Sequence, residues 1–423
     1  MFRKKHSLIK GTLILTSAGL VSRVLGFFFR IFLSHTFGEE QVGLYQLIFP
    51  FYALCLSLST SGLETAISRS VSRFHSLGRT QDGKLIFQTG LILSVMISLI
   101  CTLLVQKNSV FLSNRFLGDP RCATLLYLIV LALPAASVHS CICGYHYGLQ
   151  RTSVPAISQL IEQFVRISSV FVLYFIFIHS GVHPEIPLAV LGIIFGELAA
   201  AGYSLFSLKK KGFDADSPYI LSISKSCSEL LRLSVPLTVN RTAITFLQGI
   251  EAASIPVCLE LASHSASEAL SIYGVLTGMA LPCILFPCAL TNSISLLLIP
   301  AVAQKQAESS SKETFLLIKK AAGGCFSLGL LCSVFFLLTG SFLGNFLFHS
   351  TLAGNFIGLL SSYWIFPRKF LISQYFSRQF HRNTCLDLSF SLHKFRSSQC
   401  DQWTGTYNPD ADDQSSWIIH PHS

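Results

Sequence analysis

The stretch G-T-L-I-L-T-S-A-G-L-V-S-R-V-L-G-F-F-F-R-I-F-L, residues 11–33, decides the fold class of this chain. Its 23 residues carry only two charges, and about 20 apolar residues cross the hydrocarbon core of a bilayer as one helix. Nine further apolar stretches follow, at about 43–66, 85–105, 122–143, 154–178, 186–208, 232–256, 271–302, 318–343 and 346–366. The sequence therefore predicts an all-α polytopic membrane protein with ten membrane helices.

Positive charge alternates between the gaps that separate these stretches. The N-terminal segment and every second gap hold 18 basic residues: Arg3, Lys4, Lys5, Lys10, Arg69, Arg73, Arg79, Lys84, Arg151, Lys209, Lys210, Lys211, Lys225, Arg232, Lys305, Lys312, Lys319 and Lys320. The alternate gaps hold three, Lys107, Arg115 and Arg121. Basic loops stay in the cytoplasm. We therefore expect a bacterial inner-membrane protein with a cytoplasmic N-terminus.

The composition excludes a soluble protein. Hydrophobic residues make up 51% of the chain, charged residues 12%, and the mean hydropathy is +0.56, whereas soluble domains carry about 25% charged residues. The net charge of +10 comes mainly from loops that would face anionic lipid headgroups, so membrane lipids are expected partners and nucleic acid is not. Arg23 and Arg30 interrupt the first apolar stretch, which we read as an uncleaved helix and not as a signal peptide.

The chain divides into two related parts and a tail. Residues 1–212 hold six predicted helices, and residues 213–360 hold four more that echo the first set weakly: a helix with a central arginine (Arg23, Arg241) precedes one opened by a tyrosine (Tyr45, Tyr273). This pattern favours two pseudo-symmetric lobes, the second incomplete. Residues 361–423 contain all three tryptophans and no spanning apolar run. We expect an aberrant or disordered tail there, with loss of the reading frame as its origin.

Ionisable residues inside the predicted helices are the candidate functional groups, because each is costly to place in a membrane. Arg23 and Arg30 are seven residues apart and share a helix face. Glu162 and Arg166 are four apart and can pair. Glu64, Glu197, Arg241 and Glu251 complete the set. We expect four buried arginines to line a cationic cavity between the lobes; a snorkelling role for Arg30 and a purely structural Glu162–Arg166 pair stay open.

No catalytic, cofactor or metal motif stands out. Cys141, Cys143 and His146 lie within six residues of one another and are too close in sequence to form a closed tetrahedral metal site. His35, His139 and His146 look isolated, which argues against a membrane-bound transferase, and no phosphate-binding loop indicates an ATP-driven pump. We therefore expect no enzyme activity, no cofactor and no metal.

Several longer motifs carry a family resemblance. They are K-G-T-L-I-L (10–15), S-R-V-L-G-F (22–27), G-E-E-Q-V-G-L-Y-Q-L (38–47), G-L-E-T-A-I-S-R (62–69), C-G-Y-H-Y-G-L-Q-R-T-S-V-P-A-I-S-Q-L-I-E-Q-F-V-R (143–166), P-L-T-V-N-R-T-A-I-T-F-L-Q-G-I-E-A-A (236–253) and Y-G-V-L-T-G-M-A-L-P (273–282). Over about residues 8–355 the chain resembles the stage V sporulation protein B-like polysaccharide exporters. That group lies in the multidrug/oligosaccharidyl-lipid/polysaccharide superfamily, which also contains lipid II flippases.

The resemblance implies a flippase for a polyprenyl-diphosphate-linked peptidoglycan or polysaccharide precursor, working by alternating access in cell-wall synthesis or sporulation. It also implies cell-wall synthesis enzymes as candidate partners. Matched position by position, it marks a substrate site at Arg23, Arg30, Glu64, Arg69, Gln159, Glu162, Arg166, Asn240 and Arg241. Two alternatives stay open: a multidrug or cation antiporter of the same superfamily, and a non-transporting, truncated membrane assembly protein.

Overall fold

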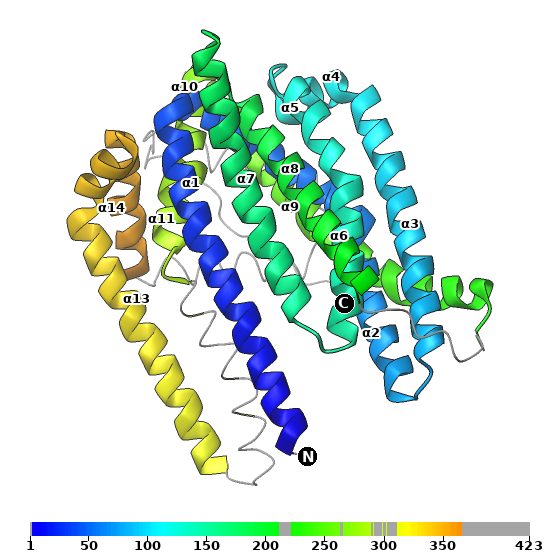
Figure 1. Cartoon of the computed structure of the whole chain (residues 1–423). Coiled ribbons are helices and arrows are strands. Elements are labelled where there is room, and N and C mark those ends of the chain that lie inside the picture. Colours follow the sequence, from blue (N-terminus) through cyan, green and yellow to red (C-terminus); the bar gives the residue numbers. More distant parts are fainter. Residues whose placement is uncertain are drawn as a thin grey trace, which may run out of the picture.

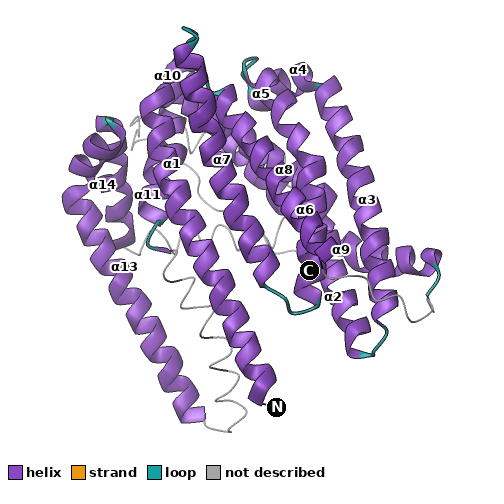
Figure 2. Cartoon of the chain, viewed as in Figure 1, coloured by secondary structure: helices purple, strands orange, loops and turns teal. Residues whose placement is uncertain are grey.

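The computed structural model describes residues 2–210, 221–262, 265–288 and 311–365, with isolated positions between 288 and 311. It contains helices and no strand in these ranges (Figure 2). The elements are α1 (Phe2–Leu56), α2 (Gly62–Ser76), α3 (Thr80–Lys107), α4 (Ser109–Leu112), α5 (Cys122–Ile129), α6 (Leu133–Gly148), α7 (Ser153–His179), α8 (Pro187–Lys210), α9 (Ile223–Leu261), α10 (Ala266–Gly274), α11 (Leu281–Leu285), α13 (Ser311–Phe348) and α14 (Thr351–Ile365).

Helix α1 holds the first predicted membrane helix and the beginning of the second. It is interrupted at Gly38, whose φ of 78° is a conformation that glycine adopts without strain. Beyond this residue the chain returns, so that the beginning of α1 and the end of α2 lie at the same, lower end of the molecule (Figure 1). The connection predicted between residues 33 and 43 is thus a break at one residue.

The described helices fit most of the predicted spans. Eight of them are long and apolar enough to cross a membrane, and the first, Leu13–Ser76, holds both spans on either side of Gly38. The tenth predicted span is the exception, because α14 has 15 residues, fewer than the roughly 20 that a crossing helix needs. The aberrant tail was expected at residues 361–423. The first five of these residues belong to α14, and residues 366–423 lie outside the described residues.

A π-helical turn at Ser57–Ser61 joins α1 to α2. Each of its hydroxyls donates to a main-chain carbonyl three or four residues earlier: Ser57 to Leu54, Ser59 to Cys55, Thr60 to Leu56 and Ser61 to Ser57. Ser57 also lies 3.2 and 3.0 Å from the hydroxyls of Thr242 and Thr245 on α9. The turn therefore links the first lobe to the second while satisfying its own polar groups.

The two lobes approach most closely through glycine. Gly43 on α1 lies against the main chain of Leu270 on α10, and Gly62 on α2 lies against Ser234 on α9. In both places a Cβ would come within 2.5 Å of a carbonyl oxygen, so only glycine permits this spacing. At the upper end, Ser34 and His35 of α1 also contact the main chain of Phe348 and Leu347.

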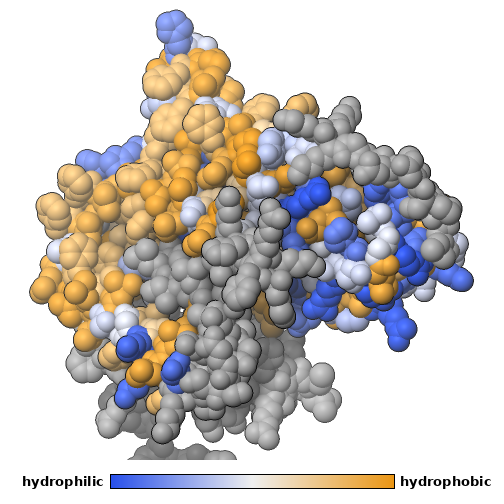
Figure 3. Space-filling model, turned by 60° about the horizontal axis from the view of Figure 1, so that its bottom comes forward, coloured by the Kyte–Doolittle hydropathy of each residue, from blue (hydrophilic) through white to orange (hydrophobic). Residues whose placement is uncertain are grey.

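Charged and hydrophilic residues lie at both ends of the bundle. At the upper end Arg121 donates to Glu40 at 2.7 Å and to Asp119 at 2.8 Å, and hydrogen bonds to Asp119 and then Glu40 raise the pKa of Arg121 above its ordinary value. At the lower end hydrophilic residues gather over the end of α2 and the beginnings of α3 and α9, whereas apolar atoms cover much of the flank (Figure 3). This distribution fits a membrane body with polar ends.

Candidate functional site

The centre of the site is a group of charged side chains between α6, α7 and α8. Gly192 and Gly196 of α8 permit this arrangement, because a Cβ on either would come within about 3 Å of main-chain atoms of α7: 3.0 Å from the Arg166 oxygen and 2.8 Å from the Glu162 oxygen. The small residues bring the two helices into close contact. Glu197, the next residue on α8, is consequently held beside Glu162 and Arg166.

Glu162 and Arg166 form the ion pair predicted from their spacing. Both side chains are about one-fifth exposed, and Arg166 also donates to Gln163 at 3.5 Å. The Nε atom of Arg166 is buried, and no described residue forms a hydrogen bond with it. A buried charge needs a partner to offset its lost hydration, and Glu162 supplies it here.

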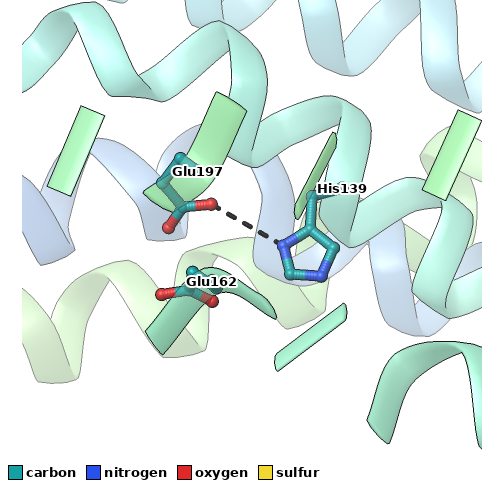
Figure 4. Close-up of side chains that lie close together, drawn as sticks. All are labelled: His139, Glu162 and Glu197. Atoms are coloured by element: carbon teal, nitrogen blue, oxygen red, sulfur yellow. Dashed lines mark ion pairs between the residues drawn. The ribbon is translucent and has the colours of Figure 1, made fainter. Parts of the chain in front are cut away.

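His139 of α6 completes this group, and its prediction as an isolated histidine was wrong. Its Nδ1 atom lies 3.6 Å from an oxygen of Glu197 (Figure 4). Its Nε2 atom lies 3.0 Å from the hydroxyl of Ser158. His35, also read as isolated, packs edge-to-face on His349 with ring centroids 4.3 Å apart. Local sequence missed both contacts because each partner comes from another helix.

Tyrosines connect the charged group to α1. Tyr45 is within electrostatic range of both Arg30 and Arg166, and Tyr52 is within range of Arg166, Glu162 and Glu197. Arg30 itself is partly buried and donates to the main-chain oxygen of Thr277 at 3.4 Å. Arginines from α1 and α7 therefore both interact electrostatically with the buried Tyr45.

On the other side, Glu64 extends the group toward the second lobe. It is partly buried on α2 and interacts electrostatically with His139 of α6 and Arg241 of α9. A Cβ on Gly144 would come within 2.7 Å of the Glu64 main-chain oxygen, so α2 and α6 are in close contact at this point. Glu64 thus interacts electrostatically with a residue of each lobe, His139 in the first and Arg241 in the second.

The expectation of four buried arginines was wrong for two of them. Arg23 on α1 and Arg241 on α9 are exposed, as are the predicted site residues Asn240 and Arg69, while Gln159 is partly buried on α7. The group is also less cationic than expected, because Glu162, Glu197 and Glu64 lie among the arginines. The exposed residues lie on α1, α2 and α9, outside the three helices α6, α7 and α8 that hold the centre of the site.

An apolar cavity of about 450 Å³ lies between α1, α3 and α9. Two of its wall residues directly follow Arg241 in the sequence. Its wall includes Leu58, Leu104, Thr242, Ala243 and Phe246. No local sequence pattern predicts this cavity, since its wall comes from three helices that are distant in sequence.

Comparisons with known proteins agree with this architecture. A family model described as "Polysaccharide biosynthesis protein" matches residues 8–306. Stage V sporulation protein B of Bacillus subtilis (strain 168) is 30% identical over 365 residues, which cover 85% of this chain and 70% of that protein. Lipid II flippase MurJ of the same organism is 24% identical, over 70% of this chain and 58% of the flippase.

Solved structures show the same fold at low sequence identity. An inward-facing multidrug resistance MATE family transporter of the MOP superfamily aligns with a TM-score of 0.55 and 14% identity, over 91% of this chain and 81% of that one. A MATE crystal structure in the straight conformation gives 0.58 and 13%, over 86% and 79%. The chain therefore belongs to the polysaccharide biosynthesis protein family, within the multidrug/oligosaccharidyl-lipid/polysaccharide superfamily of membrane transporters.

Proposed function

We propose that this protein is a flippase that moves a polyprenyl-diphosphate-linked saccharide between the leaflets of the bacterial cytoplasmic membrane. The observation that carries the proposal is that three arginines make no ion pair within the described residues. In the described ranges no carboxylate lies within ion-pair distance of Arg23, Arg30 or Arg241. A guanidinium without a carboxylate partner is available for an anionic ligand.

The chemistry of arginine suits a diphosphate. Its planar fork donates two parallel hydrogen bonds to phosphate oxygens and keeps its charge at every physiological pH. Arg23 and Arg30 come from α1 in the first lobe, and Arg241 comes from α9 in the second. A ligand bound by both helices would therefore respond to movement of one lobe relative to the other. Arg166 differs, because Glu162 already neutralises it.

The apolar cavity supports the lipid part of the proposed substrate. Thr242 and Ala243, which directly follow Arg241, belong to its wall. A polyprenyl chain already lies in hydrocarbon, and it would meet an equally apolar surface in this cavity. The headgroup would lie at the arginines and the beginning of the tail in this cavity.

Alternating access would use the two lobes, residues 1–212 and 213–360. The contact of Gly43 with α10 would hold them together at the upper end, which we place outside the cell because the basic gaps lie at the other end. Binding shifts such an equilibrium only by the difference in affinity between the two states. Lipid II is the substrate named for the flippase relative from Bacillus subtilis, and lipid-linked sugars with a diphosphate are the class proposed here.

The test is a translocation assay with the full chain in proteoliposomes, using a fluorescent polyprenyl-diphosphate sugar that a membrane-impermeant reagent quenches in the outer leaflet. Wild-type protein should move it, and Arg30→Ala should slow it at least about tenfold, as expected for loss of a charge-assisted hydrogen bond. Arg115→Ala, an exposed arginine beyond α4, is the matched control. Transport of a cationic dye without the lipid would support an antiporter instead. Movement of neither, by correctly inserted protein, would favour a non-transporting assembly protein.

A further inference from the structure

Three possible metal ligands converge inside the first lobe. His139 of α6, Glu162 of α7 and Glu197 of α8 each place one ligand atom within 4.8 Å of the other two (Figure 4). The close contact of Gly192 and Gly196 with α7 produces this convergence, because it brings the two carboxylates together from adjacent helices. Two carboxylates in an apolar environment repel each other unless a cation lies nearby.

The hydrogen bonds around His139 leave one ring nitrogen facing Glu197. Ser158 donates its only hydroxyl proton to the main-chain oxygen of Pro155 at 2.9 Å, so its oxygen accepts a hydrogen bond from His139 Nε2. In a neutral imidazole the proton is then on Nε2, and Nδ1 carries a lone pair. This arrangement is the one found around metal-binding histidines, whose second nitrogen donates to a neighbouring acceptor.

The facing oxygen of Glu197 makes no hydrogen bond within the described residues. Glu197 is 9% exposed, and its Oε2 atom is buried without a hydrogen bond. It lies 3.6 Å from His139 Nδ1, beyond the roughly 2.7–3.2 Å of an N–H···O hydrogen bond. Two ligands about 2.1 Å from one metal ion lie roughly 3.0–3.5 Å apart, so this separation is close to that of two ligands of one ion.

We propose that His139, Glu162 and Glu197 form a binding site for a divalent transition-metal ion. One imidazole nitrogen and two carboxylates suit Mn²⁺, Fe²⁺ or Zn²⁺, and the imidazole disfavours Mg²⁺ and Ca²⁺. The ion neutralises both carboxylates and gives the Glu197 oxygen the contact that no hydrogen bond provides within the described residues. The remaining coordination positions belong to water.

Arg166 competes with the ion for one ligand. Glu162 pairs with Arg166. A bound ion therefore weakens this ion pair, and an intact ion pair weakens binding of the ion. Two kinds of substitution should therefore change the metal affinity in opposite directions. Removing a ligand should weaken metal binding, whereas removing the Arg166 charge should strengthen it, because Glu162 is then free and a nearby positive charge is lost.

The experiment measures Mn²⁺ binding to the purified full chain in detergent by electron paramagnetic resonance, where free Mn²⁺ gives a six-line signal that binding removes. Mn²⁺ is chosen because it prefers oxygen and nitrogen to the thiols of the many cysteines. Glu197→Gln, Glu162→Gln and His139→Asn should each weaken binding at least about tenfold, in the range seen when a metal site loses a supporting group. Arg166→Gln should tighten it severalfold.

Matched controls come from exposed residues of the same types. His179→Asn on α7 and Glu260→Gln on α9 alter exposed side chains and should leave the affinity unchanged. Absence of saturable Mn²⁺ binding by the wild type, equal binding by Glu197→Gln, or weaker binding by Arg166→Gln would each overturn the proposal. Because damage to the fold cannot tighten a site, the Arg166 variant separates a metal site from a structural cluster. None of these measurements depends on transport, so they stand independently of the proposed substrate.

Discussion

Gly43 of α1 and Gly274 of α10 lie main chain against main chain: a Cβ added to Gly274 would be 2.5 Å from the Gly43 nitrogen and 2.8 Å from its Cα. The pair belongs to opposite lobes, and no side chain separates the two helices at this point. The spacing of the lobes is therefore set by backbone atoms, which cannot move aside as a flexible side chain would.

A methyl group at Gly43 should force the lobes apart at this end, because the new Cβ would lie 2.1 Å from the Leu270 oxygen. In Gly43→Ala, a cysteine introduced at Thr277 should react severalfold faster with an aqueous thiol reagent than in the protein with Gly43. Gly202→Ala is the control, since nothing lies within 4 Å of a Cβ there. Equal reaction rates in all three backgrounds would show that this contact does not hold the lobes together.

Arg241 should matter for transport and not for insertion, because its side chain is exposed and makes no ion pair within the described residues. We expect Arg241→Ala to reduce translocation of the lipid-linked sugar at least about tenfold. Arg241→Lys should restore part of the rate, because lysine keeps the charge and loses the fork. Arg232→Ala, an exposed arginine on the same helix, serves as control. Normal transport by Arg241→Ala would remove α9 from the proposed site.

Asp82 should be a main stabilising residue at the lower end. It is 1% exposed, accepts from Arg79 at 2.6 Å and from the main-chain nitrogen of Leu221 at 2.9 Å. Asp82→Ala leaves both donors without this acceptor and should lower the stability by about 2 kcal/mol or more. The fraction of monodisperse protein after heating, measured by size-exclusion chromatography, reports the loss. Glu185→Ala in the exposed loop before α8 should behave as wild type, and so should Asp82→Ala if the contacts carry no stability.

The charge alternation predicts which loops face outward. A cysteine introduced at His183 should react with an impermeant maleimide added to intact cells, whereas one at Ser76 should react only after the membrane is opened. Both positions are exposed. The signal of the unsubstituted protein, which has its own cysteines, is subtracted. The reverse labelling pattern would invert the predicted topology.

The helices could be predicted from the sequence because long apolar runs and basic gaps are local signals. The Glu162–Arg166 pair was predicted for the same reason, since a spacing of four residues places two side chains next to each other on a helix. The break at Gly38 was expected only as a loop, because spacing does not show how few residues a reversal needs.

The centre of the site could not be predicted in the same way. His139 contacts Glu197 across 58 positions of sequence, and only helix packing brings them together. One local signal was present: Gly192 and Gly196 form a G-x-x-x-G pattern, which marks close helix contact and precedes Glu197 directly. The exposure of Arg23 and Arg241 was missed because a charge in an apolar run does not indicate which neighbours cover it.

The π-helical turn at Ser57–Ser61 bears on how the protein enters the membrane during synthesis. Four hydroxyl residues in five positions would make this segment a poor substrate for insertion if each hydroxyl needed water. Every one donates to a carbonyl three or four residues earlier in the chain, so the nascent helix satisfies these hydroxyls before any later helix is made. The hairpin around Gly38 can therefore partition into lipid as an early unit of biogenesis, and α9 joins Ser57 only once the second lobe has been translated.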